Sequence, residues 1–380
     1  MDHISPPVME TESNLSTSIQ SPVRSILAEH EDPYRELNLA ESGALTRCEL
    51  NAGELDIELT FPYPVAGITR PLVKLLKPKF EALKDVKEAF IRIRQDVPVV
   101  PARSGTEAIP GVRQVICVAS GKGGVGKSTT AVNLALALQV EGARVGILDA
   151  DIYGPSQALM LGVQGQRPET HDGKTFEPVI AHGLPVMSMA FLLTERSPTI
   201  WRGPMVSGAF TQMLRQTNWG ELDYLVIDLP PGTGDIQLTL SQQVPVNGAV
   251  VVTTPQDIAL MDARRGIEMF RRVDVPVIGV VENMSLHTCS NCGHTEHLFG
   301  EGGGDRIATE YDTQLLGALP LALSIREQTD SGKPSVISDP DGPVAQLYRE
   351  IARQVGARLA LFARTQGGHD LITKTQGTDE

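Results

Sequence analysis

Residues 112–129 read VRQVICVASGKGGVGKST, and this stretch decides the fold. An apolar run leads into a glycine-rich loop, and the loop leads into the helical pattern STTAVNLALALQV. Gly121 to Ser128 match G-x-x-x-x-G-K-[ST], a pattern in which successive backbone N–H groups surround phosphate oxygens. The helix that follows adds the positive end of its dipole to that cradle. We therefore predict a phosphate-binding loop between a buried strand and a helix.

Two side chains of this loop have expected contacts with a nucleotide. Lys127 is expected at the β- and γ-phosphate oxygens, and the Ser128 hydroxyl is expected to ligate Mg²⁺. The predicted nucleotide-binding residues of the loop are Gly121, Lys122, Gly123, Gly124, Val125, Gly126, Lys127, Ser128 and Thr129. Lys122 is one lysine more than such a loop requires, so its ammonium group needs a separate explanation.

Carboxylates follow two further apolar strands. Asp149 and Asp151 lie in GILDADIYGPS (146–156), and Asp228 lies in DYLVIDLPPGTGD (223–235). Ligands of open α/β sheets gather at the carboxyl ends of the strands, so we expect these groups beside the phosphate loop. Asp228 is predicted to hold Mg²⁺ through water. The loop PPGTGD (230–235) has few side chains to fill a core, and we expect it to rearrange when the γ-phosphate leaves.

From residue 112 onward, short apolar runs alternate with helical stretches. The predicted strands are 112–119, 143–149, 184–190, 223–228, 248–254, 276–282 and 315–319. Near-continuous apolar runs indicate strands buried on both faces, so we predict a mainly parallel sheet covered by helices, of the α/β P-loop NTPase class. A last helix over 343–364 has an apolar stripe, predicted to dock on this domain rather than on a membrane surface; the stripe consists of Val344, Leu347, Ile351, Val355, Leu359 and Phe362.

The N-terminal part of the chain has a different pattern and predicts a small α+β domain over residues 22–97. We expect a helix over 22–31, strands over 44–50, 54–61 and 86–93, and a helix through 72–83 that begins near Pro71 and is kinked or split at Pro78. Residues 1–21 are predicted to be a disordered tail, 98–111 a linker, 112–365 the ATPase domain and 366–380 a flexible tail.

Composition excludes several classes of protein. The chain has 33 basic and 46 acidic residues, a net charge of −13, which repels nucleic acid and anionic lipid. No apolar stretch is long enough to span a membrane, and the N-terminus lacks the pattern of a secretory signal. Four cysteines in 380 residues do not form a disulfide framework, so we expect a reducing cytoplasm.

Cysteine and histidine concentrate in HTCSNCGHTEH (287–297). Cys289 and Cys292 form a C-x-x-C pair, which supplies two thiolates for a metal or a cluster and needs two more ligands. Two chains could join their pairs around a 4Fe–4S cluster. One chain could hold zinc with the nearby histidines, which are His287, His294 and His297. The pair could also be a redox dithiol, although its flanks do not resemble a thioredoxin.

The early lysine, the D-A-D strand end and D-L-P-P-G-T-G-D together resemble the deviant Walker A ATPases, which include MinD, ParA and the nitrogenase iron protein. Within that class, DADIYGPS, VIDLPPGTGD, TTPQDIAL, ENMS and the following C-x-x-C are similar, in order and spacing, to the Mrp/ApbC family of iron–sulfur cluster carriers. The resemblance covers roughly residues 111–365.

The resemblance implies a homodimer. Lys122 is then expected to reach the nucleotide of the partner, as a catalytic residue beside Lys127, and Asp151 is expected to orient the attacking water. Asn283 is expected to contact adenine. Cys289 and Cys292 are expected to bridge the cluster between protomers. A lysine from a facing subunit would stabilise the charge that develops at the γ-phosphate.

We therefore predict a Mg²⁺-dependent, cytoplasmic ATPase that carries a labile 4Fe–4S cluster to apoproteins, with a scaffold protein as a further partner and no contact with nucleic acid or membrane. The alternatives are a MinD/ParA-like positioning ATPase and an ATPase with a structural zinc site. The small domain resembles the N-terminal domain of Mrp proteins, whose relatives often carry a cysteine after the second strand. LTFPYPVAG (59–67) has none, so we assign this domain to client or partner recognition.

Overall fold

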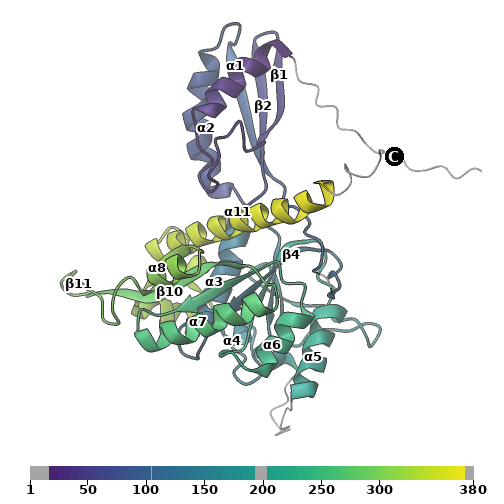
Figure 1. The fold of residues 1–380 in the computed structure, drawn as a ribbon, viewed down its shortest axis with the longest axis vertical. Coiled ribbons are helices and arrows are strands. Elements are labelled where there is room, and N and C mark those ends of the chain that lie inside the picture. The colour runs from purple at the N-terminus through teal and green to yellow at the C-terminus, as the bar shows by residue number, and fades with distance from the viewer. Residues whose placement is uncertain (1–16, 104, 193–202, 373–380) are drawn as a thin grey trace, which may run out of the picture. The chain divides into compact units, whose positions relative to one another are not determined.

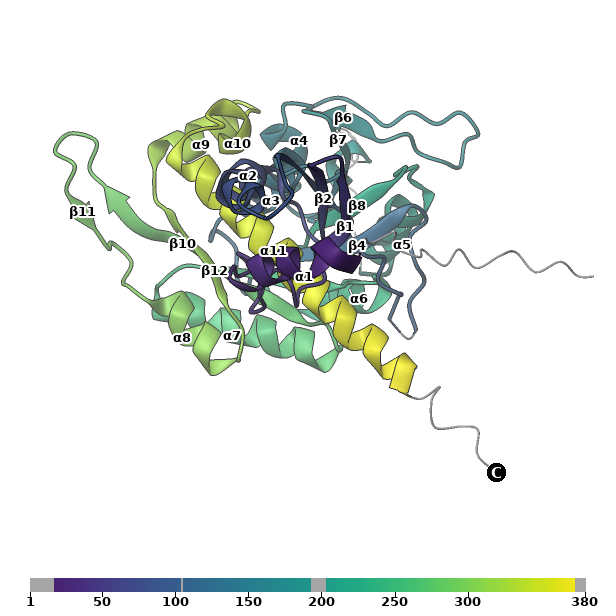
Figure 2. The same cartoon turned by 90° about the horizontal axis from the view of Figure 1, so that it is seen from above.

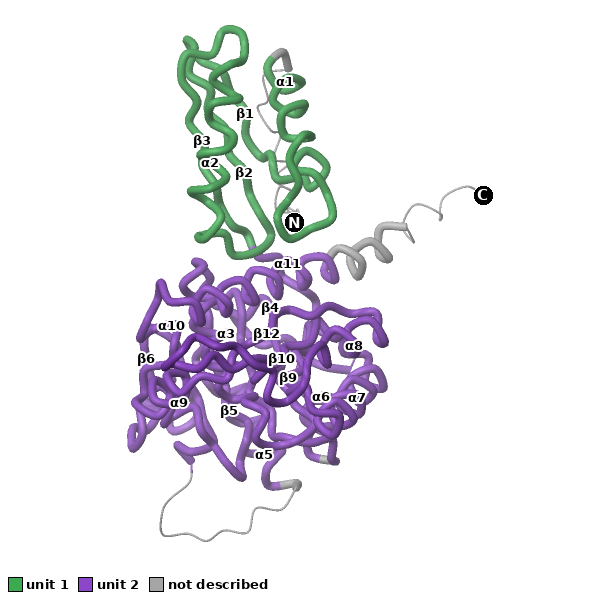
Figure 3. Tube along the Cα trace, turned by 90° about the vertical axis from the view of Figure 1, so that its left-hand side faces the viewer, with its two compact units in different colours: residues 1–96 green, residues 97–380 purple. Residues whose placement is uncertain are grey.

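The computed structural model of the chain describes residues 17–103, 105–192 and 203–372. The chain forms two compact units, Met1–Asp96 and Val97–Glu380 (Figure 3). They are described separately below as unit 1 and unit 2.

Unit 1 is a three-stranded sheet with helices on one face. Its elements are α1 (Thr17–Ala28), β1 (Leu45–Asn51), β2 (Glu54–Phe61), α2 (Ala66–Glu81) and β3 (Glu88–Gln95). β1 and β2 are antiparallel, joined by a turn in which Ala52 and Gly53 have φ angles of 52° and 93°. β2 and β3 are parallel and are connected through α2. Alternate residues of β2 are buried, as its sequence pattern predicts.

The helices of unit 1 differ from the prediction. α1 begins at Thr17, inside the predicted tail, and ends at Ala28; residues 1–16 lie outside the described residues. α2 begins at Ala66, so Pro71 lies in its second turn, and the helix continues unbroken through Pro78. The predicted split is therefore wrong. Burial of one apolar face outweighs the hydrogen bonds lost at the prolines; that face consists of Ile68, Leu72, Leu76 and Phe80.

Unit 2 is built around one mainly parallel sheet, which confirms the predicted fold class (Figure 1). Its strands are β4 (Val112–Ala119), β5 (Val145–Asp149), β6 (Val179–Ala181), β7 (Leu184–Ser188), β8 (Leu222–Asp228), β9 (Gly248–Thr253), β10 (Val277–Thr288), β11 (Thr295–Glu296) and β12 (Leu315–Pro320). Their order is β11-β10-β9-β4-β8-β5-β7-β6, and β12 pairs with β10. The short strands β6 and β11, which we did not predict, pair antiparallel with β7 and β10.

Helices cover both faces of this sheet. They are α3 (Lys127–Val140), α4 (Gln157–Met160), α5 (Gly203–Gln216), α6 (Asp235–Gln243), α7 (Asp257–Arg272), α8 (Gly303–Glu310), α9 (Leu323–Asp330), α10 (Ser335–Ser338) and α11 (Pro343–Ile372), with a 3₁₀ turn at Met189–Phe191. One apolar core joins the sheet to α3 and α11. A second core on the opposite face joins it to α5 and α7. The strands are therefore buried on both sides, as their apolar runs predict.

The predicted linker packs on unit 2. The Arg103 guanidinium donates hydrogen bonds to the backbone oxygens of Ser241 at 2.8 Å and Val244 at 3.1 Å. Gln114 donates to the backbone oxygen of Pro98 at 2.9 Å, and Ile109 is buried. Unit 2 consequently begins at Val97 rather than at residue 112. These side-chain contacts cannot be read from the Pro- and Gly-rich composition of the segment.

The last helix lies along unit 2 and is longer than predicted (Figure 1). α11 continues to Ile372, through part of the predicted C-terminal tail, and residues 373–380 lie outside the described residues. Its apolar face is buried, which confirms docking on the domain, but that face includes Tyr348 whereas Leu347 is 36% exposed. Among the residues that the structure describes, no helix combines the length and the apolar character needed to span a bilayer.

Candidate functional site

The phosphate-binding loop lies between β4 and α3, as predicted, and two of its glycines are required by close contacts. Gly126 has a φ angle of 87°, and a Cβ atom there would lie 2.1 Å from Asn283 Nδ2. A Cβ atom on Gly121 would lie 2.1 Å from the backbone oxygen of Asp262, at the middle of α7. Larger side chains at these positions would push the loop away from β10 and α7.

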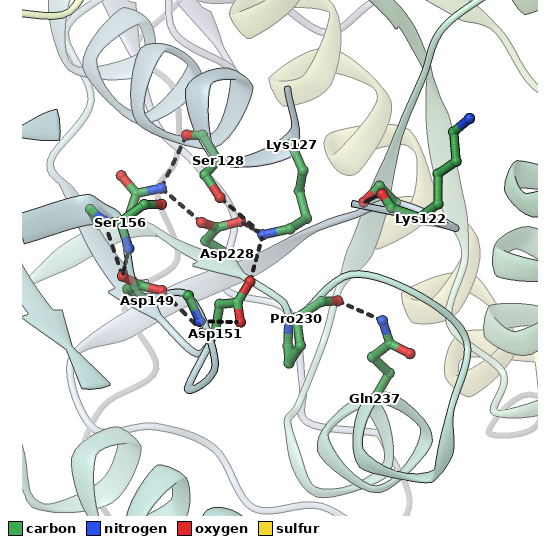
Figure 4. A network of polar contacts seen from close by, with 12 residues as sticks. Lys122, Lys127, Ser128, Asp149, Asp151, Ser156, Asp228, Pro230 and Gln237 are labelled. Carbon is green, nitrogen blue, oxygen red and sulfur yellow. Dashed lines mark hydrogen bonds and ion pairs between the residues drawn. The ribbon is translucent and has the colours of Figure 1, made fainter. Parts of the chain in front are cut away.

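Lys127, the first residue of α3, is only 6% exposed, and its ammonium group is surrounded by acceptors (Figure 4). It forms an ion pair with Oδ1 of Asp228 and lies 3.1 Å from Oγ of Ser128. Asp151 Oδ2 lies 4.0 Å away. The predicted phosphate lysine and the predicted magnesium carboxylate are thus in direct contact. The buried cation and the buried anion compensate each other's charge.

Asp149 is buried at the end of β5 and holds the loop that follows it. Its carboxylate accepts hydrogen bonds from the backbone N–H groups of Asp151, Ser156 and Gln157 at 3.1, 3.0 and 3.0 Å. The Ser188 hydroxyl, at the end of β7, adds a fourth bond of 2.9 Å. Burial raises the pKa of Asp149, and the neighbouring Asp228 carboxylate raises it further. The geometry favours a structural role for Asp149.

Asp151 lies at the edge of the site and is less constrained. Its Oδ1 accepts one hydrogen bond of 3.2 Å from the backbone N–H of Gly154. Burial raises the pKa of this carboxyl, and the Lys127 ammonium opposes the shift. Asp151 borders a cavity of about 620 Å³ whose lining includes Tyr153, Pro230, Pro231 and Gln237. Asp151 therefore has space beside it for another group.

Gln157 is a site residue that the sequence analysis missed. It begins α4 and is fully buried. Its Nε2 donates to Oδ2 of Asp228 at 2.8 Å and to the backbone oxygen of Ser128 at 3.0 Å. Its Oε1 is buried without a hydrogen-bond partner among the described residues. No sequence pattern marks this glutamine, because its partners are distant along the chain.

The loop 230–234 follows Asp228 and contacts the phosphate-binding loop. The Gly232 N–H donates to the backbone oxygen of Ser120 at 2.9 Å. Gln237, in the first turn of α6, donates to the backbone oxygen of Pro230 at 2.5 Å and accepts from the Gly234 N–H at 2.8 Å (Figure 4). One side chain therefore holds both ends of a loop that otherwise has few anchors.

Lys122 and Asn283 are the two remaining predicted residues near the phosphate-binding loop. The Lys122 side chain points away from the group formed by Lys127 and its acceptors (Figure 4). Within the described ranges its ammonium group has no acidic partner, and only its backbone oxygen is held, by the Ser120 hydroxyl at 2.9 Å. Asn283, in β10, donates from Nδ2 to the backbone oxygen of Val125 at 2.9 Å. Its side-chain amide thus contacts the loop itself.

The cysteine pair lies on a hairpin that projects from unit 2 between β10 and β11 (Figure 2). The Cys289 N–H donates to the His294 backbone oxygen at 2.8 Å, and the Gly293 N–H donates to the Cys289 backbone oxygen at 2.9 Å. Cys292 is exposed and Cys289 is half-buried. Backbone N–H groups of Asn291 and Cys292 lower the pKa of the Cys289 thiol. The pair is therefore accessible and one thiol is biased toward the thiolate.

Two of the three nearby histidines have a ring nitrogen close to a backbone oxygen. His287 Nδ1 lies 3.0 Å from the Leu321 backbone oxygen, and His297 Nδ1 lies 2.8 Å from the Ser285 backbone oxygen. Among the residues that the structure describes, no three His, Cys, Asp or Glu side chains converge as a set of metal ligands.

Comparisons with known proteins identify the family to which this chain is similar. The model of the ParA family, described as NUBPL iron-transfer P-loop NTPase, matches residues 111–356. An iron-sulfur cluster carrier protein of Pseudomonas fragi is 59% identical over 75% of this chain and 100% of its own length. The Escherichia coli K12 protein of the same name is 47% identical over 92% of this chain and 95% of its own length. The iron-sulfur cluster transfer protein NUBPL of Mus musculus is 54% identical over 66% of this chain and 79% of its own length.

A solved structure extends the likeness to three dimensions. The nucleotide-binding protein of Archaeoglobus fulgidus in complex with ADP is 37% identical to this chain, with a TM-score of 0.55. The alignment covers 62% of this chain and 91% of that one.

Proposed function

The chain belongs to the ParA family of NUBPL iron-transfer P-loop NTPases, and from this premise we propose that it is an iron–sulfur cluster carrier that hydrolyses ATP. The observation that carries the proposal is the course of β10. This strand places Asn283 against the phosphate-binding loop and then continues into the hairpin that presents Cys289. A single strand thus connects the nucleotide site to the thiols, so a change at one end can alter the other.

The described residues fit a magnesium nucleotide. Ser128 Oγ and Asp228 are oxygen ligands of the kind that Mg²⁺ prefers, and the buried Gln157 Oε1 is an acceptor that still lacks a donor. When bound, Mg²⁺ would neutralise charge on the β- and γ-phosphates. Lys127 would exchange Asp228 for phosphate oxygens, because both are anions within reach of its ammonium group.

Three groups are assigned to the hydrolysis step. Asp151 would accept a hydrogen bond from the attacking water, since it borders the cavity and is only lightly held by Gly154. Lys122 would act on the nucleotide of a partner chain, because its own side chain points away from Lys127. The loop 230–234, anchored by Gln237, would respond to the loss of the γ-phosphate.

Asn283 is assigned to binding of the base. Its side-chain amide would contact adenine after giving up its hydrogen bond to the backbone oxygen of Val125.

The cluster is cargo that two chains hold together. Cys289 and Cys292 offer two thiolates, and a second copy supplies the two that a 4Fe–4S cluster still needs. The Lys122 side chain, which points away from Lys127, is an independent reason to propose a facing subunit. We therefore assign a homodimer in which nucleotide and cluster sites are both completed by the partner, with apoproteins as recipients and a scaffold as donor. Four free thiols suit a reducing compartment such as the cytoplasm.

We further assign unit 1 to recognition of clients or partners. Its sheet and helices form a separate compact body, and its cysteine, Cys48, is buried on β1. The segment LTFPYPVAG (59–67) offers no thiol to a cluster. The thiol chemistry would therefore remain with unit 2.

Anaerobic reconstitution with iron and sulfide tests the proposal. The wild-type protein is expected to gain broad visible absorbance, with iron and sulfide contents that correspond to one cluster shared by two chains. Cys289→Ser and Cys292→Ser should abolish the absorbance, while Cys48→Ala, a buried thiol outside the hairpin, should retain it. A single zinc ion per chain that resists exchange would contradict the proposal, and so would a cluster held by the monomer.

A further inference from the structure

Arg103 lies where two helices of unit 2 end. Its guanidinium donates hydrogen bonds to the backbone oxygens of Ser241 at 2.8 Å and Val244 at 3.1 Å, at the C-terminal end of α6. It also donates to the backbone oxygen of Val273, the C-cap residue of α7. Asp274, which follows Val273, adds a favourable charge nearby. None of these residues has a part in the nucleotide or cluster chemistry assigned above. We call this set of contacts the arginine bridge.

The chemistry of the bridge favours arginine over lysine. The last carbonyl groups of a helix lack partners within the helix and form the negative end of its dipole, so a cation is favourable there. A guanidinium group presents five N–H donors in one plane and can therefore serve the ends of two helices at once. The ammonium group of lysine is a compact point charge and reaches fewer of these oxygens. Replacement by lysine should thus keep the charge but only part of the bridge.

The two bridged helices differ in how firmly they are attached to the sheet. α7 has 16 residues and buries an apolar face that includes Ala263, Ile267 and Phe270. α6 has nine residues, and its fully buried apolar side chain is Leu240. Burial of an apolar face is the main source of helix stability in a folded protein. α7 is therefore the support, and the bridge adds to the attachment of α6.

The other end of α6 holds the loop 230–234 at the nucleotide site. Gln237, in the first turn of this helix, donates to the backbone oxygen of Pro230 (Figure 4) and accepts from the Gly234 N–H. Gln237 and Ser241 are four residues apart, which is about 6 Å along the helix axis. Helices bend only gently, so a displacement at the C-terminal end of such a short helix reaches its first turn. The bridge thus acts on the residue that anchors the loop.

We propose that Arg103 is a positioning residue for the loop 230–234, because it fixes α6 against α7 and so sets the place of Gln237. The claim about position stands on the fold alone, whereas the effect on ATP turnover rests on the proposed ATPase function. Without the bridge, α6 shifts and the loop is less often in the arrangement that hydrolysis needs. The phosphate-binding loop lies close to α7, where Gly121 meets Asp262, so nucleotide binding should change little.

Hydrogen exchange of the full-length protein, followed by mass spectrometry, tests the position of the loop without reference to ATP. The Gly232 N–H donates to the Ser120 backbone oxygen at 2.9 Å, and the Gly234 N–H donates to Gln237 at 2.8 Å, so both amides should be protected. Arg103→Ala should speed exchange in peptides that cover the loop by about fivefold or more, and Arg103→Lys should speed it by less.

The matched control for this experiment is Arg215→Ala. This arginine of α5 donates to the backbone oxygen of Ala108 at 2.9 Å, so its loss removes an arginine–backbone contact of the same kind that does not involve α6 or α7. Loop exchange in this variant should stay within about twofold of wild type. If Arg103→Ala speeds exchange at the C-terminal end of α6 but not in the loop, the positioning claim is overturned, since the bridge then acts only locally.

The effect on hydrolysis is tested with the same variants. Arg103→Ala should lower kcat by about tenfold and change KM for ATP by less than about threefold. Guanidinium chloride at millimolar concentration should restore part of the lost turnover, because the ion can occupy the position of the missing side chain. The same ion is a denaturant, so it cannot restore activity lost through unfolding. Sodium chloride at equal concentration should give no gain, and guanidinium should give none in Arg215→Ala.

The outcomes separate the positioning claim from the proposed function. A wild-type protein that hydrolyses no ATP contradicts the proposed function, and the exchange measurement still decides the positioning claim. A loosened loop with unchanged turnover contradicts the effect on hydrolysis alone. Turnover that falls in Arg103→Ala without recovery in guanidinium also contradicts that effect, because a destabilised fold then explains the loss.

Discussion

Nε2 of Gln157 lies 2.8 Å from Oδ2 of Asp228, although the two residues are 71 positions apart in the sequence. The same nitrogen lies 3.0 Å from the backbone oxygen of Ser128. One buried amide therefore joins the carboxyl end of β8 to the first turn of α3, at the point where the nucleotide's metal and phosphates are expected. Gln157 acts as a positioning residue for Asp228 and Ser128.

Replacement of Gln157 tests this positioning role. Gln157→Ala removes both hydrogen bonds and should lower the free energy of unfolding of unit 2 by about 1–3 kcal/mol, since buried polar partners lose their donor. ATP turnover should fall roughly tenfold or more through misplacement of Asp228. Trp219 is buried in unit 2, and residues 1–96 contain no tryptophan, so tryptophan fluorescence during urea unfolding reports on unit 2. Gln166→Ala, at an exposed glutamine, is the control, and equal effects of the two substitutions would contradict the assignment.

Mixed dimers test whether Lys122 acts across the interface. Lys127→Ala should lower ATP turnover at least about a hundredfold, because the phosphate charge loses its main cation. Lys122→Ala should be similarly inactive. An equal mixture should recover roughly a quarter of wild-type turnover, since half of the dimers then contain one complete site of two. The mixture would stay inactive if Lys122 served its own chain.

Thiol reactivity should separate the hairpin from the core. Burial raises the pKa of Cys48 to about 11 and that of Cys117 to about 12, whereas backbone N–H groups lower the pKa of Cys289. The thiolate is the reactive form, so at any mildly alkaline pH Cys289 has the larger reactive fraction. Iodoacetamide followed by mass spectrometry should modify Cys289 before Cys48 and Cys117. Unfolded protein, in which all cysteines react alike, is the control; the same order of reaction there would refute the explanation.

The docking of α11 on α3 depends on a buried ion pair with Glu141, the residue that directly follows α3. Glu141 is fully buried and lies 2.6 Å from Nε of Arg349 and 2.7 Å from Nη1 of Arg353. Glu141→Ala should destabilise unit 2 by about 3–5 kcal/mol, because two largely buried guanidinium groups lose their shared carboxylate. Glu350→Ala removes the more exposed carboxylate beside Arg353 and should cost less than about 1 kcal/mol. Urea midpoints of the two variants give the comparison; equal shifts would be inconsistent with this account.

Much of unit 2 could be predicted from local pattern. Strands such as β4 and β8 are continuous apolar runs, and burial on both faces is a property that such runs carry by themselves. Two short strands, β6 and β11, were missed. β11 has two residues and exists because β10 extends beyond its apolar part to pair with it. The helix α2 continues through both of its prolines, because burial of its apolar face outweighs the low helix propensity of proline.

The residues of the candidate site likewise include some that local sequence predicts and some that it does not. The residues of the phosphate-binding loop are adjacent in sequence, so one motif predicts all of them. Gln157 and Ser188 act on Asp228 and Asp149 through contacts between segments that are distant along the chain, and no local pattern marks such residues. Asn283 was predicted from the resemblance, but its contact with Val125, 158 positions away, required the folded chain.

By itself, the sequence determined the class of fold, the position of the phosphate-binding loop and the presence of one thiol pair, because each depends on neighbouring residues and on periodic burial. Only the tertiary structure decided which carboxylate Lys127 contacts and which amide orients that carboxylate. It also decided that His287 and His297, two of the three histidines near the thiols, lie against backbone oxygens. Those outcomes depend on which segments the sheet brings together and on the need of every buried polar group for a partner.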